Sequence, residues 1–283
     1  MPFRPPVPGF PLEFEWQDNE WLQVFDRQVG LLLDDITRAR TEDRMVVYLS
    51  CPISSKGGSF KNTNVEIARA TQRRIQERFG SRVWVLNPAQ YQLESKEGAG
   101  LLRRHAVDLG ISLDHLDSLP PPRGGDYMRM WTKVLVEDDR EQAGWHFDAY
   151  YFLSPSDTSA FFDAEGPTDA TEAVETYFAR KYTTDLDFKT SFDGEADWES
   201  LRKDFVRFYT FRSGAAYSSG CHDEWNILCL LNERRLKTGG VGDLLSAWWD
   251  GRQVTPGAMQ AISPGYGRTA SRKPTPKPMQ SDS

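Results

Sequence analysis

The stretch Met45-Val46-Val47-Tyr48-Leu49-Ser50 decides the fold class of this chain. It is a short apolar run, too brief for a helix and rich in strand-forming residues, so it predicts a buried β-strand. Small polar residues follow from Cys51 to Lys61, and an amphipathic helix is expected after them, up to about Phe79. A strand, a polar loop and a helix in this order form the start of a βαβ unit.

Further apolar runs continue this alternation. Residues 82–88 and 147–153 are expected to form a second and a third strand. Helices are expected over Trp21–Arg40 and from Asp126 to Val136. The pattern predicts an α/β fold, with a Rossmann-like parallel sheet flanked by helices.

Two insertions interrupt the alternation, at residues 89–125 and 163–210. We expect an N-terminal arm and helix over residues 1–44 and one main domain over residues 45–262, whose last part, 241–249, is an amphipathic segment. Residues 263–283 are rich in Pro, Ser and Lys and are expected to form a disordered tail.

Composition excludes several classes of partner. The chain has 283 residues and a formal net charge of −7, which argues against a nucleic-acid polymer as the main partner. Its three cysteines, Cys51, Cys221 and Cys229, support neither a disulfide framework nor a zinc site. The start of the chain lacks a signal-like apolar region, and no apolar run reaches membrane-spanning length. We therefore expect a cytoplasmic protein with no membrane partner.

A second informative stretch is Ser218-Ser219-Gly220-Cys221-His222-Asp223-Glu224, which runs into an apolar segment. It predicts a loop feeding a helix, with Asp223 and Glu224 in or near the first turn, where the helix dipole favours an ionised carboxylate. Such a carboxylate can act as a nucleophile on an electron-poor carbon. The alternative is that both acidic residues only cap the helix.

Other candidate sites have similar alternatives. The loop from Cys51 to Lys61 offers backbone N–H groups, hydroxyls and lysines to an anion, or is a plain surface loop. Trp131 could stack on a nucleobase or belong to the core. The histidines are scattered, and the neighbours His222, Asp223 and Glu224 point in different directions, so we expect no metal and no cofactor.

Three pieces of the chain together resemble the nucleoside 2-deoxyribosyltransferase-like superfamily, which includes nucleoside 5′-monophosphate N-glycoside hydrolases. The first piece is Val47–Ile53. The second is Gly124-Gly125-Asp126 before a helix, followed by the strand Asp148–Leu153. The third is Ser218-x-Gly220-x-x-x-Glu224.

The resemblance implies a Rossmann-like enzyme that hydrolyses or transfers the N-glycosidic bond of a nucleoside or nucleoside 5′-monophosphate. Glu224 would be the nucleophile at the anomeric carbon, and Asp148, Asp126 or His222 would protonate the leaving base. The implied substrate-binding residues are Cys51, Pro52, Ile53, Ser54, Lys56, Trp131, Ser218, Ser219, Gly220 and His222. Related enzymes often build sites across subunits, so a homodimer is compatible with the resemblance.

The sequence also departs from the family pattern. His222 stands where the family usually has a second glycine, and Lys133 lies near the place of an acidic residue. Two alternatives therefore stay open beside the glycosidase: an NAD-cleaving glycohydrolase, and a nucleotide-binding protein without catalysis.

Overall fold

A mixed five-stranded sheet forms the centre of the molecule. The computed structural model describes residues 2–54, 58–95, 98–138, 142–164, 169–193, 198–249, 252–255 and 258–269. The strands lie in the order β3 (Val83–Leu86), β2 (Met45–Ser50), β4 (Ala149–Phe152), β5 (Ser246–Trp249) and β6 (Arg252–Val254). The first four are parallel and β6 is antiparallel to β5. The predicted α/β fold with a parallel sheet is confirmed.

The strand order creates a crevice beside β2. The chain passes from β2 to β3 on one side, and then returns to β4 on the other side of β2. In the parallel register, Ser50 at the end of β2 pairs with Phe152 at the end of β4. In sheets of this kind, ligands bind outside the carboxyl ends of the strands, where the order reverses.

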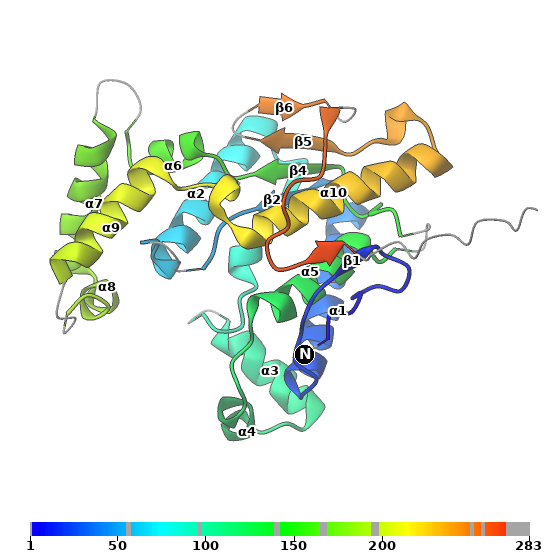
Figure 1. The fold of residues 1–283 in the computed structure, drawn as a ribbon, viewed down its shortest axis with the longest axis horizontal. Coiled ribbons are helices and arrows are strands. Elements are labelled where there is room, and N and C mark those ends of the chain that lie inside the picture. The colour runs from blue at the N-terminus through cyan, green and yellow to red at the C-terminus, as the bar shows by residue number, and fades with distance from the viewer. Residues whose placement is uncertain are drawn as a thin grey trace, which may run out of the picture.

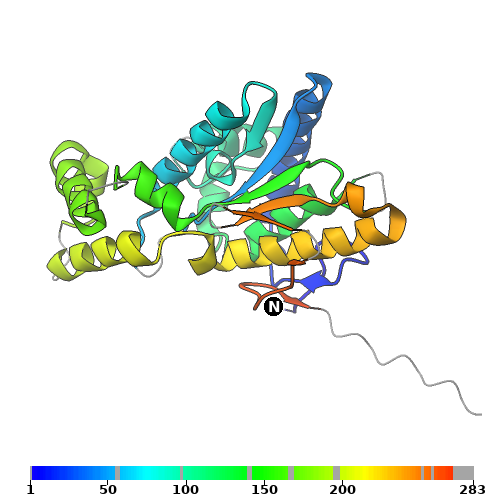
Figure 2. The same ribbon diagram turned by 90° about the horizontal axis from the view of Figure 1, so that it is seen from above.

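Helices cover both faces of the sheet. Figure 2 shows α10 running along one side of the strands and α2 on the other. The helices are α1 (Trp21–Thr41), α2 (Lys61–Phe79), α3 (Ala99–Leu109), α4 (Leu113–Ser118), α5 (Gly124–Val136), α6 (Pro155–Phe161), α7 (Ala170–Thr184), α8 (Leu186–Thr190), α9 (Trp198–Phe211) and α10 (Ser219–Thr238). Short 3₁₀ turns lie at Pro88–Gln90, Ala215–Tyr217 and Val241–Asp243. Among the described residues, no helix is both long and apolar enough to cross a membrane.

Side-chain alternation along the strands assigns each face to its own core. Tyr48 and Tyr150 belong to the core that also contains the buried faces of α1, α5 and α10. Leu49 and Tyr151, the next residues along, belong to the core on the α2 side. This period of two places Tyr48 and Ser50 on the same face of β2, toward α10.

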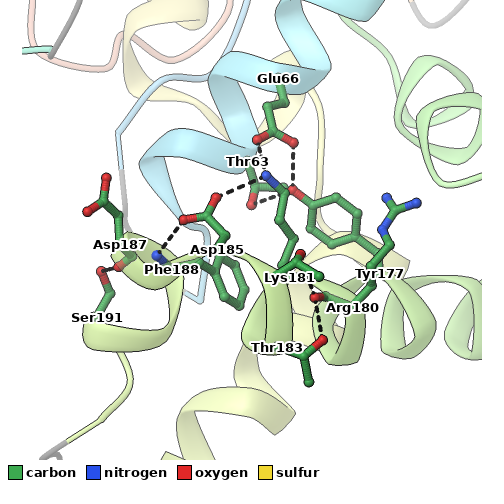
Figure 3. Close-up of polar contacts among 11 residues, drawn as sticks. Thr63, Glu66, Tyr177, Arg180, Lys181, Thr183, Asp185, Asp187, Phe188 and Ser191 are labelled. Atoms are coloured by element: carbon green, nitrogen blue, oxygen red, sulfur yellow. Dashed lines mark hydrogen bonds and ion pairs between the residues drawn. The ribbon is translucent and has the colours of Figure 1, made fainter.

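The second predicted insertion holds a group of helices that projects from the sheet. Helices α7, α8 and α9 lie together at the left of Figure 1. Figure 3 shows how Lys181 of α7 bridges Glu66 of α2 and Asp185, while the Tyr177 hydroxyl donates to Glu66 at 2.8 Å. These contacts tie the helical group to the helix that follows β2.

The C-terminal part contains strands that the sequence did not indicate. The segment expected to be amphipathic contains β5, which completes the parallel part of the sheet. The expected tail is ordered up to Thr269, because β7 (Arg268–Thr269) pairs antiparallel with β1 (Leu12–Glu13) of the N-terminal arm. Residues 270–283 lie outside the described part of the chain.

Candidate active site

Glu224 projects from the second turn of α10 and not from its first. The helix begins at Ser219, and the Ser218 hydroxyl caps it by accepting a hydrogen bond from the backbone N–H of Cys221. The prediction that the dipole at the first turn of the helix keeps Glu224 ionised is therefore wrong. Burial instead raises the pKa of Glu224 from its ordinary value of 4.5 to about 7.

Two hydroxyl groups of β2 hold the Glu224 carboxyl group. The Tyr48 hydroxyl donates to Oε1 at 2.8 Å, and the Ser50 hydroxyl donates to Oε2. Desolvation raises the pKa of this 5% exposed side chain, the bonds from Ser50 and Tyr48 lower it, and the neighbouring Asp223 raises it slightly further. With a pKa near 7, the group can gain or lose a proton at neutral pH, as acid–base and nucleophilic groups in enzymes do.

Glu224 lines a cavity of about 360 Å³ at the carboxyl end of β2. This volume is in the range of small-molecule sites. One wall is the chain that follows β2, and others are the N-terminal ends of α5 and α10. The cavity residues from these three segments are Cys51, Ile53, Ser54, Pro122, Arg123, Gly124, Tyr127, Met128, Trp131, Ser218 and Gly220.

The cavity combines aromatic and cationic groups. Tyr127 and Trp131 contribute ring surfaces, while Lys61 and Arg123 contribute positive charge. Two helices, α5 and α10, begin at the cavity, and helix N-termini favour anions. These groups suit a ligand that carries both a flat ring and an anionic group.

Seven of the residues predicted from the sequence line this cavity. They are Cys51, Ile53, Ser54, Trp131, Ser218, Gly220 and Glu224. Three others, Pro52, Ser219 and His222, do not line it. Lys56 lies outside the described residues.

Asp148 is at the wrong end of the sheet to act on a substrate beside Glu224. It directly precedes β4, whereas Glu224 lies at the carboxyl ends of the strands. Its carboxylate pairs with Arg40 at 2.8 Å and accepts a hydrogen bond from the Val46 backbone N–H at 2.7 Å. The structure therefore does not bring Asp148 to the cavity that contains Glu224, and the contacts of Asp148 instead join α1 and β2 to the start of β4.

Asp126 has a structural role at the start of α5. Its carboxylate accepts hydrogen bonds from the backbone N–H groups of Gln17 and Arg123, both at 2.7 Å. It lines a neighbouring cavity and not the one that contains Glu224. The structure therefore does not bring Asp126 into the cavity of Glu224, where the resemblance implied that it could protonate the leaving base.

The two departures from the family pattern also have structural partners. Lys133 forms an ion pair with Asp26 at 2.9 Å and does not line the cavity. The ring nitrogens of His222 lie 3.1 Å from the carbonyl oxygen of Ser263 and 2.9 Å from that of Ala216. His222 thus contacts the C-terminal segment in place of a substrate.

Sequence analysis missed several residues of the site. Tyr48 and Ser50 could have been found, because residues two apart at the end of a buried parallel strand share one face. Glu94 and Tyr266 carry no local signal, since separate segments bring them to the cavity. Lys61, at the end of the loop that was expected to offer lysines to an anion, also lines it.

The cysteines have the properties of buried thiols. Burial raises the pKa of Cys51, Cys221 and Cys229, so none of the three has the reactivity of a thiolate nucleophile. Within the described part of the chain, no group of three or more His, Cys, Asp or Glu side chains is arranged to hold a metal ion.

No family model, curated protein or solved structure matches this chain.

Proposed function

We propose that this chain hydrolyses or transfers the N-glycosidic bond of a nucleoside 5′-monophosphate, with Glu224 as the nucleophile. One observation carries the proposal: a buried carboxyl group with a pKa of about 7 is held by two hydroxyl donors in a small-molecule cavity. The aromatic and cationic walls of that cavity fit the base and the phosphate of a nucleotide.

The chemistry follows from the ionised form of Glu224. A carboxylate oxygen attacks the anomeric carbon, the C–N bond breaks, and its electron pair leaves with the base. Water or a second base then displaces the carboxylate from the sugar and releases one proton to the solvent, and this restores Glu224 in its ionised form. The carboxylate oxygen that does not attack keeps the hydrogen bond from its own hydroxyl donor during both steps. This bond fixes the orientation of the carboxyl group.

The departing base needs a proton, which it takes from water, and we assign Glu94 to relay that proton across the cavity. Glu94 is a second carboxyl group in the cavity lining. Its Oε2 accepts a hydrogen bond from the Tyr127 hydroxyl at 3.0 Å and lies 4.0 Å from Lys61 Nζ. Asp148 and Asp126 are bound elsewhere, so neither competes with Glu94 for this role.

Positive charge in the cavity favours a phosphorylated substrate over a neutral nucleoside. Lys61 and Arg123 both line the cavity, and the N-termini of α5 and α10 add their backbone N–H groups. A 5′-phosphate would interact with these groups through its charge, whereas a neutral 5′-hydroxyl would not. We therefore expect a lower KM for a nucleoside 5′-monophosphate than for the matching nucleoside.

A specific observation keeps NAD cleavage as a second candidate. A neighbouring cavity of about 320 Å³, lined by Phe3 and Trp16, shares Arg123, Gly124 and Tyr266 with the first. Two adjoining cavities with aromatic walls can hold the two halves of a dinucleotide. Nicotinamide release from NAD would identify this activity.

The test is a panel of nucleosides, nucleoside 5′-monophosphates and NAD, each incubated with the purified chain. Free base is followed by chromatography. The proposal expects base release from at least one 5′-monophosphate, faster than from its nucleoside. Binding of the nucleotides without any free base after long incubation would contradict it and favour a non-catalytic nucleotide-binding protein.

A further inference from the structure

The C-terminal strap, residues 258–269, lies against the outer side of α10. In Figure 2 it is the red segment beside the N-terminal arm, below α10. Its last two residues form β7, which pairs with β1 of that arm. The two ends of the described chain are thereby joined next to the helix that carries Glu224.

Four residues around Glu224 hold the strap. The Trp225 indole N–H donates to the carbonyl of Gln260 at 2.8 Å. The Asn226 side chain accepts from the backbone N–H of Ile262 at 2.8 Å and donates to its carbonyl at 3.0 Å. His222 contacts the carbonyl of Ser263, as described above.

Asp223 makes the closest set of contacts. Its carboxylate accepts from the backbone N–H groups of Gly265 at 2.9 Å, Tyr266 at 2.7 Å and Gly267 at 3.2 Å. Asp223 is fully buried. Successive residues on a helix are turned by about 100°, so Asp223 faces the strap while Glu224 faces β2.

This anchoring brings Tyr266 to the cavity. Tyr266 lines the same cavity as Glu224, together with Tyr127 and Trp131. Its ring packs on Gly124 at the start of α5 so closely that a Cβ at position 124 would overlap it. A Cβ at Gly265 would likewise overlap the carbonyl group of Ser219. The strap therefore has one close-packed position, with the ring of Tyr266 at the cavity.

We propose that Tyr266 contacts the substrate and sets its affinity through the nucleobase, and that Asp223 is the positioning residue for Tyr266. This inference rests on the proposed function in taking a nucleotide as the ligand. Aromatic side chains stack on any base, and such a contact adds affinity without taking part in bond cleavage. The strap thus supplies binding energy, while the opposite side of the same helical turn supplies the nucleophile.

The test compares variants in binding and in turnover, with nucleoside 5′-monophosphates as probes. Tyr266→Ala is expected to weaken nucleotide binding by about 10- to 100-fold, which is the range of base–aromatic stacking. Tyr266→Phe should keep most of the affinity, because the ring remains. Tyr182→Ala, on α7 and outside the cavity, is the matched control and should bind like the wild type.

Asp223→Asn tests the positioning role of Asp223, both in the protein without ligand and in nucleotide binding. Hydrogen exchange at the amides of residues 265–267 should become faster, because an amide side chain has only one acceptor oxygen for three donors. Nucleotide affinity should fall in the same direction as for Tyr266→Ala, and KM should rise more than kcat falls. Asp43→Asn, on an exposed side chain in the turn after α1, is the control.

The outcomes separate this inference from the proposed function. Unchanged affinity in Tyr266→Ala, or no nucleotide binding by the wild type, would overturn the inference. Equal hydrogen exchange in the wild type and Asp223→Asn would overturn the role of Asp223. If nucleotides bind the wild type and bind Tyr266→Ala more weakly, but no base is ever released, the inference stands and the glycosidase proposal fails.

Discussion

At the scale of single residues, Glu224 is held at a cost to stability. Ionising a buried carboxyl group is unfavourable, and the donors Tyr48 and Ser50 offset only part of that cost, because the pKa of Glu224 still rises to about 7. A purely structural position would be served as well by a neutral side chain. The cost is compatible with the proposed role of Glu224, because perturbed pKa values are common at functional sites.

Replacing Glu224 by Gln should stabilise the chain at high pH relative to the wild type. The pKa of Glu224 is higher in the folded state than its ordinary value of 4.5, so the wild type loses stability as pH rises from about 4.5 to about 7. Gln cannot ionise and avoids this loss, which amounts to about 2–3 kcal/mol between pH 5 and pH 8. Urea unfolding of both proteins at these two pH values measures it. A difference between the proteins that does not change with pH would contradict the raised pKa.

Tyr48→Phe should move the pH dependence of base release to higher pH. The variant lacks the donor to Oε1, so the ionised form of Glu224 loses a stabilising contact and its pKa rises further. A hydrogen bond to a charged group contributes about 1.5–3 kcal/mol, which corresponds to a shift of about one pH unit or more. The rate at pH 7 should fall while the rate at pH 9 approaches that of the wild type. A uniform loss across the range would show that Tyr48 acts in another way.

At the scale of helices and strands, the sequence indicated most of the architecture. Apolar runs located β2, β3 and β4, and helical periodicity located α1, α2 and α5, because each element buries one continuous face. The short strand β5 was missed, since its Ser246-Ala247-Trp248-Trp249 segment follows directly on another amphipathic stretch. The start of α10 was placed too late, because acidic residues at Asp223 and Glu224 resembled a first turn.

Long-range contacts explain why the site was predicted only in part. The residues after β2 and before α10 were found because they directly follow a strand or directly precede a helix, and the sequence indicates both positions. Asp148 was expected in the site, but it precedes β4 and lies at the amino end of that strand. The pairing of β4 with β2 shows this, and the sequence alone does not. Tyr266 was assigned to a tail, since contacts with residues distant in the sequence, such as the buried Asp223, bring it to the cavity.

Asp148→Asn should leave base release unchanged, because Asp148 lies at the amino end of β4. The Asn oxygen can still accept from the Val46 N–H, but the ion pair with Arg40 loses its charge. That pair is about one-third exposed on each side, so the expected cost is about 1 kcal/mol or less in unfolding free energy. Turnover assays and urea unfolding check the two parts. A loss of activity above tenfold would return Asp148 to the catalytic site.

At the scale of the whole molecule, two distant segments support the cavity. The strap brings Tyr266 from the C-terminal side. On the other side, the helical group α7–α9 packs against the chain after β2, where Tyr209 of α9 accepts from the Phe60 N–H at 2.9 Å and donates to Asn64 at 2.7 Å. The insertion therefore reaches the cavity indirectly, by fixing the loop that forms one wall.

Tyr209→Phe should loosen that loop and destabilise the chain. The variant removes the Tyr209 hydroxyl as the partner of the Phe60 N–H and of the Asn64 side-chain oxygen, at a cost of about 1–3 kcal/mol. Tyr182→Phe is the matched control, because its hydroxyl bonds Asp193 at an exposed position. Urea unfolding and hydrogen exchange at residues 58–64 are the measurements. Equal effects of the two substitutions would mean that Tyr209 has no special role in holding the loop.

The most direct test of the central claim is base release from a nucleoside 5′-monophosphate between pH 5 and pH 9, in the wild type, Glu224→Gln and Glu233→Gln. Glu233 is an exposed residue on the same helix and controls for the change in charge. We predict that kcat/KM of the wild type rises through a pKa near 7, that Glu233→Gln follows it, and that Glu224→Gln is slower by about a thousandfold or more. Base release by Glu224→Gln within tenfold of the wild-type rate would contradict the account.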